Sequence, residues 1–228
     1  MRRFTLLAAA LVAAAGSLPT VSARAAAPAL FGTAEFRADS LAALPQWRRV
    51  LDRMAAESGA LAACARVHRS CPSPGARDWL ALLRRLDGEP RWQQLRAVNR
   101  FANDRPYRSD GENYGRSDYW ATPLEFLRRS GDCEDYAIIK YASLRRLGWP
   151  AEQLRLVVLK DVVRDLPHAV LVVYLGGTAY ILDNLTDAIL PQERITHYVP
   201  YYSVNEVARW AHAPQDSLVV TMTASARP

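Results

Sequence analysis

Three residues, Cys133, His168 and Asp183, have the side chains that nucleophilic catalysis requires. Cys133 follows Gly131-Asp132 at the predicted start of a helix, where the helix dipole favours the thiolate form of a cysteine. An imidazole can take the thiol proton, and a carboxylate can hold that imidazole in the orientation the transfer needs. The three residue types together predict a Cys-His-Asp site for acyl transfer.

A predicted β-hairpin places His168 and Asp183 on the same face of a sheet. Two short segments rich in β-branched residues flank Gly176-Gly177, which suits a two-residue turn. With that turn, Val170 lies opposite Asp183, and His168 is two residues away on the same strand face. His168 and Asp183 are then diagonal neighbours about 7–8 Å apart at the backbone. A three-residue loop would place them on opposite faces.

Each of these residues also has an ordinary structural interpretation. Cys133 could be a half-buried cysteine without a chemical role, His168 could simply begin a strand, and Asp183-Asn184 could form a turn. The other histidines lack an acidic partner at a defined spacing, and the best substitute base among them is His197. The functional interpretation depends on all three residues coming together.

The elements that must position these residues are helices first and strands afterwards, which predicts an α+β fold. Apolar periodicity predicts helices over about 41–54, 79–86 and 92–101, followed by a long polar loop over 103–119. Thr122, Pro123 and Glu125 form a helix start, and Ser130-Gly131 ends that helix. The next helix runs from Asp132 or Cys133 to Leu147. The predicted strands are 154–163, 169–175, 179–182, 198–204 and 218–223.

The first 25 residues have the composition of a secretory signal peptide, so we expect a periplasmic protein. Arg2 and Arg3 precede an apolar stretch of about fifteen residues, and Ala23-Arg24-Ala25 suits the cleaving peptidase. That stretch is shorter than the ~20 residues that span a bilayer, and no later stretch is long and apolar enough. Residues 26–228 are then expected to form a single domain that does not span the membrane.

The net charge bears on the kind of partner that the protein binds, and the number of cysteines bears on disulfide formation. Removal of the leader takes away three arginines and leaves 26 basic against 23 acidic residues. A scattered excess this small does not predict a nucleic-acid partner. In an oxidising compartment Cys64 and Cys71 could form a disulfide, leaving Cys133 as the free thiol, although both could also be reduced and buried.

From about Val98 to Tyr202 the chain resembles the bacterial transglutaminase-like cysteine proteases of the LapG type. The resemblance is strongest in WATPLEFLRRSGDCEDYAIIKYASLRRLG, HAVLVV and YILDN. It implies a papain/transglutaminase-like fold in which the catalytic cysteine begins a helix packed on an antiparallel sheet. It also implies that Cys133, His168 and Asp183 form the triad of a periplasmic, calcium-dependent endopeptidase.

The resemblance further implies a substrate and a partner. The substrate would be the N-terminal region of a large surface adhesin, cut at a pair of alanines, and its release would disperse biofilm. The partner would be a LapD-like inner-membrane cyclic-di-GMP receptor that sequesters the protease when the messenger is abundant. Two rival functions share the sequence features: a transglutaminase or other acyltransferase on the same scaffold, and an exported binding module whose cysteine is structural.

Three carboxylates, Asp132, Glu134 and Asp135, flank the nucleophile. Acidic residues are common at a helix N-terminus, where the dipole favours them, but beside a thiol they oppose formation of the thiolate. A bound hard cation would remove this conflict, and calcium prefers carboxylate ligands. The resemblance implies a calcium site at Asp132 and Glu134, with Asp135 as a further candidate.

Two smaller features of the site remain open. The loop before the nucleophile could line a peptide cleft or could simply pack against the core; its residues in question are Tyr107, Asn113, Tyr114, Tyr119 and Trp120. The backbone N–H of Cys133 is the first candidate for the oxyanion donor, because it lies at a helix start.

Overall fold

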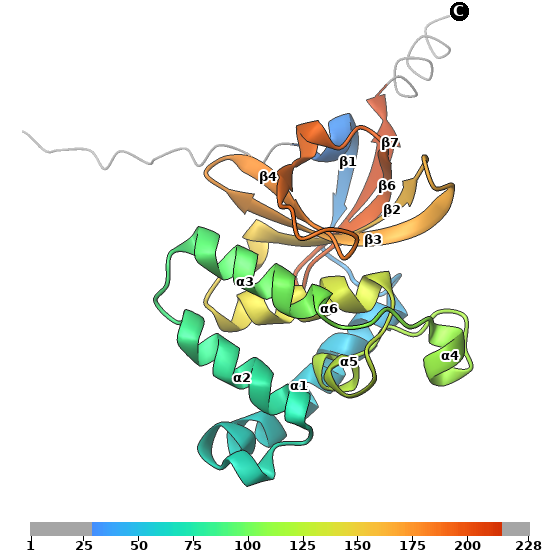
Figure 1. Ribbon diagram of the computed structural model, residues 1–228. Helices are drawn as coiled ribbons and strands as arrows, with labels where there is room; N and C mark the ends of the chain where they lie inside the picture. The colour runs from blue at the N-terminus through green and yellow to red at the C-terminus, as the bar shows by residue number, and fades with distance from the viewer. Residues whose placement is uncertain (1–28, 216–228) are drawn as a thin grey trace, which may run out of the picture.

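The computed structural model describes residues 29–215, so the leader and the predicted strand 218–223 lie outside the described residues. Helices form a layer on one side of an antiparallel sheet, as Figure 1 shows. The α+β class predicted from the sequence is confirmed. The helices are α1 (Pro45–Arg66), α2 (Pro74–Leu86), α3 (Arg91–Asn103), α4 (Asp110–Tyr114), α5 (Pro123–Arg129) and α6 (Cys133–Arg146).

The predicted loop over 103–119 is wrong in part, because it contains the short helix α4. Ser109 caps this helix and forms a capping box with Glu112. The sequence analysis did identify the same device at the start of α5, where Thr122 and Glu125 form a capping box that the structure confirms. Ser130 ends α5, and α6 begins at Cys133, as the sequence predicts.

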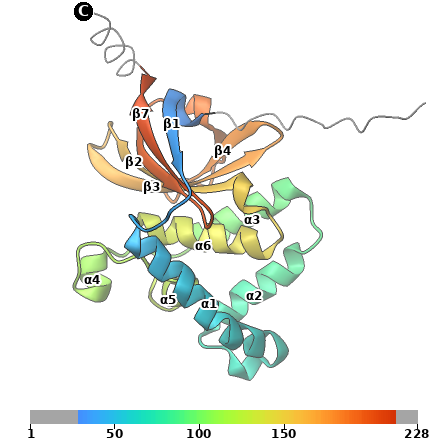
Figure 2. The ribbon, with the colours of Figure 1, turned by 180° about the vertical axis from the view of Figure 1, so that it is seen from behind.

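The sheet has seven strands in the order β1-β7-β6-β2-β3-β4-β5, and every neighbouring pair is antiparallel. The strands are β1 (Thr33–Ala38), β2 (Leu154–Asp161), β3 (Leu166–Leu175), β4 (Thr178–Leu182), β5 (Leu190–Pro191), β6 (Tyr198–Val204) and β7 (Arg209–Pro214). The order of helices first and then strands therefore needs one correction. Strand β1 precedes all the α-helices and pairs with β7 at the edge of the sheet, side by side in Figure 2.

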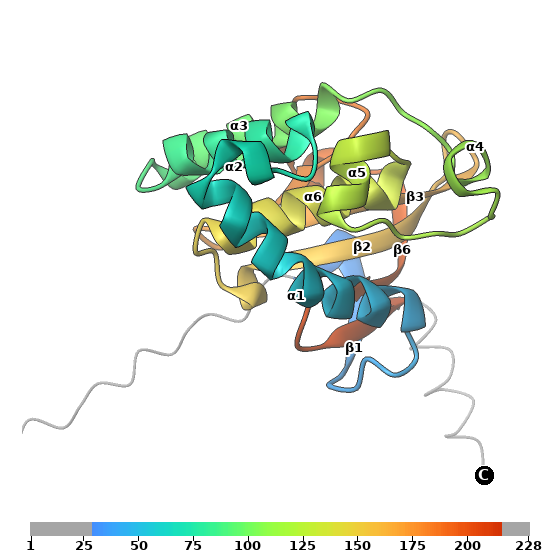
Figure 3. The same cartoon turned by 90° about the horizontal axis from the view of Figure 1, so that it is seen from below.

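Helix α6 is the centre of the structure and is buried on both sides. One side packs on β2 and β3, and the other packs against α3 and α5 (Figure 3). Each fully buried Leu or Ile side chain contributes about 2 kcal/mol through removal from water. The sheet-facing cluster includes Ile138, Tyr141 and Leu144, and the helix-facing cluster includes Tyr136, Ile139 and Ala142. This packing fixes where the first turn of α6 lies.

The cysteines are arranged as one of the sequence alternatives describes. Cys64 and Cys71 form a disulfide that ties the end of α1 to the segment leading into α2. Cys133 is the free cysteine of the chain and is partly buried. Any thiol chemistry of the native protein therefore belongs to Cys133.

Candidate active site

The segment leading into Cys133 is held in an unusual backbone conformation. Ser130 has a φ of 63°, in the left-handed region that disfavours a side chain. Gly131 follows, and a Cβ there would lie 1.9 Å from a carboxylate oxygen of Asp135, so only glycine fits. The backbone N–H of Arg108 donates to the Gly131 carbonyl at 2.9 Å. These constraints place Cys133 at the first position of α6.

The hairpin of β3 and β4 brings His168 and Asp183 together. Leu175 pairs with Thr178, which confirms the predicted two-residue turn at Gly176-Gly177. His168 Nε2 lies 2.9 Å from Asp183 Oδ1, and both side chains are buried. The predicted His-Asp pair is therefore confirmed as a contact.

Two further groups hold the Asp183 carboxylate. The Tyr198 hydroxyl donates to Asp183 Oδ2 at 2.5 Å, and the Leu185 backbone N–H donates to Oδ1 at 3.0 Å. Burial raises the pKa of Asp183, but the contacts with His168, Tyr198 and Leu185 outweigh it and hold that pKa below its usual value. Asp183 therefore stays ionised beside the imidazole.

Tyr198 is a site residue that the sequence analysis missed. It begins β6, which pairs with β2 rather than with either strand of the hairpin. Its distance from Asp183 in the chain gives no sign of contact. The available signal was only that a tyrosine begins a predicted strand.

The Cys133 sulfur lies between strand β3 and its own acidic neighbours. The backbone N–H of Ala169, the residue after His168, favours the thiolate. The thiol donates to Glu134 Oε2 at 3.2 Å. Burial raises the pKa of the Cys133 thiol, and the charges of Glu134 and Asp132 raise it further. With these carboxylates charged and uncompensated, the thiolate is strongly disfavoured.

Three carboxylates converge next to this thiol. Oxygens of Asp110, Asp132 and Glu134 all lie within 4.8 Å of one another. Burial raises the pKa of Glu134 to about 8, and burial also raises that of Asp110 to about 6. One side-chain oxygen each of Asp110 and Asp132 is buried without a hydrogen-bond partner. An all-oxygen set with unpartnered acceptors suits a hard divalent cation.

The structure thus brings together Asp132 and Glu134 but adds Asp110, which the sequence analysis did not identify. Asp110 is 22 residues before Asp132 and lies in α4, inside the segment predicted to be a loop. The capping box around it was the one local signal of an ordered turn. Its side chain reaches the carboxylates of Asp132 and Glu134 because α4 and the residues before it contact Ser130 and Gly131.

Asp135 lies outside this cluster of three carboxylates, so its role as a further metal residue stays a prediction. One oxygen of Asp135 accepts from the Ala121 backbone N–H at 2.6 Å, and its side chain packs directly under Gly131. Successive side chains of a helix point in directions about 100° apart, so Asp135 and Glu134 face different surroundings. Asp135 therefore supports the backbone around the nucleophile.

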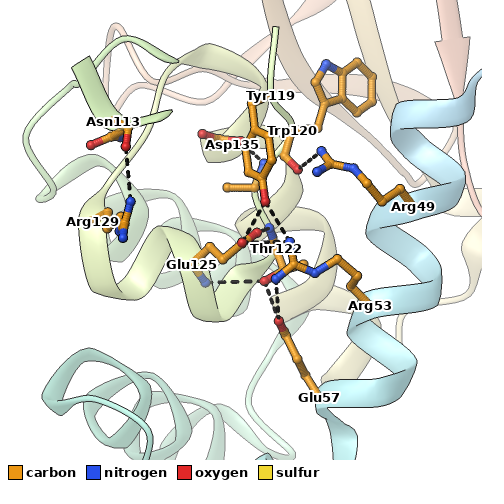
Figure 4. A network of polar contacts seen from close by, with 11 residues as sticks. Arg49, Arg53, Glu57, Asn113, Tyr119, Trp120, Thr122, Glu125, Arg129 and Asp135 are labelled. Carbon is orange, nitrogen blue, oxygen red and sulfur yellow. Dashed lines mark hydrogen bonds and ion pairs between the residues drawn. The ribbon is translucent and has the colours of Figure 1, made fainter. Parts of the chain in front are cut away.

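A polar network holds the segment around Tyr119, whose backbone contacts the carboxylate cluster at Asp110; Figure 4 shows the network. The Arg53 guanidinium pairs with Glu125 at 2.7 Å, and the Tyr119 hydroxyl donates to the same carboxylate at 2.8 Å. Thr122 Oγ1 donates to Glu57 at 2.8 Å. The Tyr119 backbone N–H in turn donates to Asp110 Oδ2. The network ties α1 and α5 to the loop that orients Asp110.

The residues considered for a peptide cleft divide into two groups. Trp120 is buried in the sheet-facing cluster, Tyr114 stacks on Tyr119, and Asn113 Nδ2 donates to the Ser130 carbonyl at 3.2 Å, so these four contact the protein itself. Tyr107 is exposed and lies close enough to Cys133 for the two to influence each other's charge. Only Tyr107 of this group combines exposure with proximity to the nucleophile.

Comparison with known proteins identifies relatives of the chain. Residues 53–217 match the family described as bacterial transglutaminase-like cysteine proteinase. A calcium-bound structure of LapG from Legionella pneumophila is 30% identical with a TM-score of 0.60, covering 71% of this chain and 98% of that one. An EGTA-treated structure of the same protein is 32% identical with a TM-score of 0.59, covering 69% and 91%. The comparison with curated proteins finds no match.

The length and the apolar character of a helix decide whether it could cross a membrane. Within residues 29–215, none of the helices combines the length and the apolar character that crossing a bilayer requires.

The contact between Tyr198 and Asp183 predicts a pH-dependent loss of stability. We expect Tyr198→Phe to lower the free energy of unfolding by about 2 kcal/mol at neutral pH, because a buried carboxylate loses a donor. The folded pKa of Asp183 is depressed, so this contribution is present above the unfolded pKa and is lost as pH falls through the folded one.

Denaturant unfolding at neutral and at acidic pH measures this difference, with the exposed Tyr201→Phe on the same strand as the control. The deficit of Tyr198→Phe should shrink in acid. A variant as stable as wild type at neutral pH would contradict the assigned contact.

Proposed function

The chain belongs to the bacterial transglutaminase-like cysteine proteinases, and we propose that it is an exported, calcium-dependent endopeptidase that releases a large surface adhesin. The observation that carries the proposal is the position of Cys133 at the start of α6, against the strand β3 in which His168 pairs with Asp183 of the segment after β4. Membership of a proteinase family disfavours the interpretation of Cys133 as merely structural.

We assign each member of the proposed triad a role. Asp183 engages His168 Nε2, so Nδ1 is the ring nitrogen left to take the Cys133 proton. The thiolate then attacks the scissile carbonyl carbon, and His168 returns the proton to the leaving amine as the C–N bond breaks. Water, deprotonated by His168, attacks the thioester, releases the carboxylic acid and regenerates the thiol.

The oxyanion of the tetrahedral intermediates requires donors close to Cys133. The first N–H groups of an α-helix have no partner within the helix, and the Cys133 N–H is among them. We assign this N–H as one donor to the developing negative charge. Ser130 and Gly131 support its direction, because they fix the backbone that enters α6.

Asp110, Asp132 and Glu134 would hold the calcium ion. The proposal draws support from relatives with calcium-bound and EGTA-treated structures, and from the unpartnered carboxylate oxygens of this chain. A bound calcium ion supplies positive charge that offsets these carboxylates, so they no longer oppose the Cys133 thiolate. Asp135 would act from outside the site by supporting the Gly131 backbone.

The substrate, location and partner extend the proposal beyond the site itself. The signal-peptide pattern of residues 1–25 supports export to the periplasm. The likeness to LapG supports a protein substrate, which we infer to be the N-terminal region of a surface adhesin cut at a pair of alanines. Cleavage would disperse biofilm, and a LapD-like cyclic-di-GMP receptor in the inner membrane would control access to the protease.

Replacement of the nucleophile tests the triad. We expect Cys133→Ala to abolish cleavage of an adhesin N-terminal fragment while changing stability by about 1 kcal/mol or less. His168→Ala should be equally inactive, and Asp183→Asn should keep residual activity because the imidazole is still present but poorly oriented. Fragment cleavage is followed by mass spectrometry in the presence of calcium.

The same assay separates hydrolysis from acyl transfer. A primary amine is added with wild-type protein, and the new carboxyl end should be free acid rather than amide. Cleavage by Cys133→Ala at the wild-type rate would refute the triad, and predominant amide formation would favour the acyltransferase.

Removal of a single cluster carboxylate tests the calcium site. We expect calcium to raise the thermal midpoint of wild type, since a ligand present at about 100 times its Kd stabilises the folded state by about 2.7 kcal/mol. Asp110→Asn should lose most of this shift and most of the calcium-dependent cleavage. Magnesium should not substitute, because it demands a tighter octahedral shell.

The matched control is Glu112→Gln, which changes an exposed carboxylate of the same helix outside the cluster. It should retain the calcium shift. Full cleavage in excess chelator, or an unchanged calcium shift in Asp110→Asn, would remove these carboxylates from metal binding.

A further inference from the structure

Four arginines line one hollow on the surface, between the segment before α4 and the end of α5. They are Arg105 and Arg108 from the loop after α3, and Arg128 and Arg129 from the last turn of α5. This hollow, which we call the arginine pocket, is open to solvent and has a volume of about 500 Å³. Among the described residues that line it, the one acidic side chain is Glu112, so four positive charges face one negative charge.

The positive charge of the arginine pocket is not compensated within the described part of the chain. None of the four guanidinium groups forms an ion pair within residues 29–215, whereas Arg53 and Arg155 each pair with a glutamate at 2.7 Å. The Glu112 carboxylate is engaged by the N–H and the hydroxyl of Ser109, both at 2.9 Å. Close like charges repel one another, so this arrangement opposes folding until an anion binds.

The helix dipole explains only part of the arginine pocket. The C-terminus of α5 favours Arg128 and Arg129, but Arg105 and Arg108 lie outside that helix. Two of the guanidinium groups are held by the backbone: Arg129 donates to the Asn113 carbonyl at 3.1 Å, as Figure 4 shows, and Arg105 donates to a carbonyl of α5 at 3.4 Å. A guanidinium group has five N–H donors, so both keep donors for a ligand.

The arginine pocket lies beside the backbone that leads into the nucleophile. Ser130 lines the pocket, and Cys133 follows it three residues later. The Arg108 N–H donates to the Gly131 carbonyl at 2.9 Å, and Tyr107 forms a β-bridge with Gly131. Consecutive Cα atoms are about 3.8 Å apart, so those of Ser130 and Cys133 are at most about 11 Å apart. An extended peptide spans that distance with about three or four residues.

The chemistry and the shape of the arginine pocket favour acidic side chains of a peptide. A guanidinium group matches a carboxylate with two parallel hydrogen bonds, and it matches a phosphate group equally well. A lipid headgroup is therefore the other source of a suitable anion. The arginines line a hollow, however, and a flat bilayer surface does not enter a hollow, whereas a peptide that passes the nucleophile can place its side chains there.

We propose that the arginine pocket is a subsite for acidic residues of the protein substrate, which bind about three to five residues from the bond that Cys133 attacks. The proposal rests on the proteolysis proposed above and adds a requirement on the sequence around the cut. The subsite is distinct from the carboxylate cluster: Asp110 of α4 belongs to the cluster, whereas Glu112 and Asn113 of the same helix line the pocket.

Matched peptides test the subsite by cleavage. Each peptide carries an Ala-Ala site in a Gly-Ser context, with either Asp-Asp or Asn-Asn about four residues before or after the cut. On at least one side, wild type should have a kcat/KM about tenfold or more higher for Asp-Asp than for Asn-Asn, and salt should reduce this ratio. In Arg128→Gln/Arg129→Gln the ratio should fall to about twofold or less, because two guanidinium partners are lost.

The matched control is Arg84→Gln/Arg85→Gln, which removes two exposed arginines from the last turn of α2. It makes the same change in net charge at the same position of a helix, and it should keep the wild-type ratio. An equal loss in this control would show a general effect of charge and overturn the subsite. If Arg128→Gln/Arg129→Gln does not fold, Arg108→Gln decides, and an unchanged ratio in that variant would overturn the subsite.

A binding measurement makes the test independent of proteolysis. A fluorescein-labelled, Asp-rich Gly-Ser peptide without an Ala-Ala pair is titrated with Cys133→Ala protein at a fixed calcium concentration, and its anisotropy gives Kd. Adding Arg128→Gln/Arg129→Gln to Cys133→Ala should weaken binding about fivefold or more. Adding the α2 control pair instead should leave Kd unchanged.

The outcomes separate the subsite from the proposed function. If no peptide is cleaved but the labelled peptide binds through the arginine pocket, the proteolytic function fails and the site for acidic peptides stands. Cleavage without preference for Asp-Asp on either side would overturn the subsite and leave the function intact. Binding of phosphatidylglycerol vesicles through the same arginines, without binding of the labelled peptide, would identify a lipid occupant and overturn the subsite.

Discussion

The structure depends on one electrostatic conflict at the first turn of α6. The thiol of Cys133 and the carboxylates of Asp132 and Glu134 belong to consecutive residues, and Asp110 approaches from α4. In a partly buried site these charges oppose the thiolate far more strongly than a helix dipole favours it. A cation bound among these carboxylates would offset their charge, so the proposed calcium site would relieve the conflict.

The rest of the fold serves to hold that geometry still. Burial of α6 between the sheet and the other helices fixes its axis, and Asp135 with Gly131 fixes the backbone that enters it. On the opposite side, Tyr198 and Leu185 fix Asp183, which in turn fixes the imidazole. Cys133 and the His168–Asp183 pair are thus positioned by different elements. These elements meet where α6 packs against β3.

The features that the sequence predicted correctly are those set by local rules. The two-residue turn determines the register of the hairpin, so the contact of His168 with Asp183 follows from chain geometry. Capping residues determine where α5 and α6 begin. The Cys64–Cys71 disulfide was one of two alternatives, and spacing alone could not choose between them.

The features that escaped prediction are set by contacts between distant segments. Asp110 and Tyr198 come from elements whose docking no local pattern reveals, and Asp135 differs from Glu134 only in the direction that one helical step imposes. Strand β1 is a partly exposed edge strand, so its burial pattern lacks the alternation that marks a strand in sequence. β1 is a strand because its backbone pairs with β7.

The central claim is that the carboxylate cluster controls the Cys133 thiolate, and alkylation of that thiol tests it most directly. Cys133 is the free cysteine, so iodoacetamide reacts with this thiol, and the rate of reaction at neutral pH rises with its thiolate fraction. The account predicts that calcium raises this rate about tenfold or more relative to chelator, which corresponds to at least one pKa unit, and that Asp110→Asn abolishes the response. Equal rates of alkylation in calcium and in chelator would contradict it.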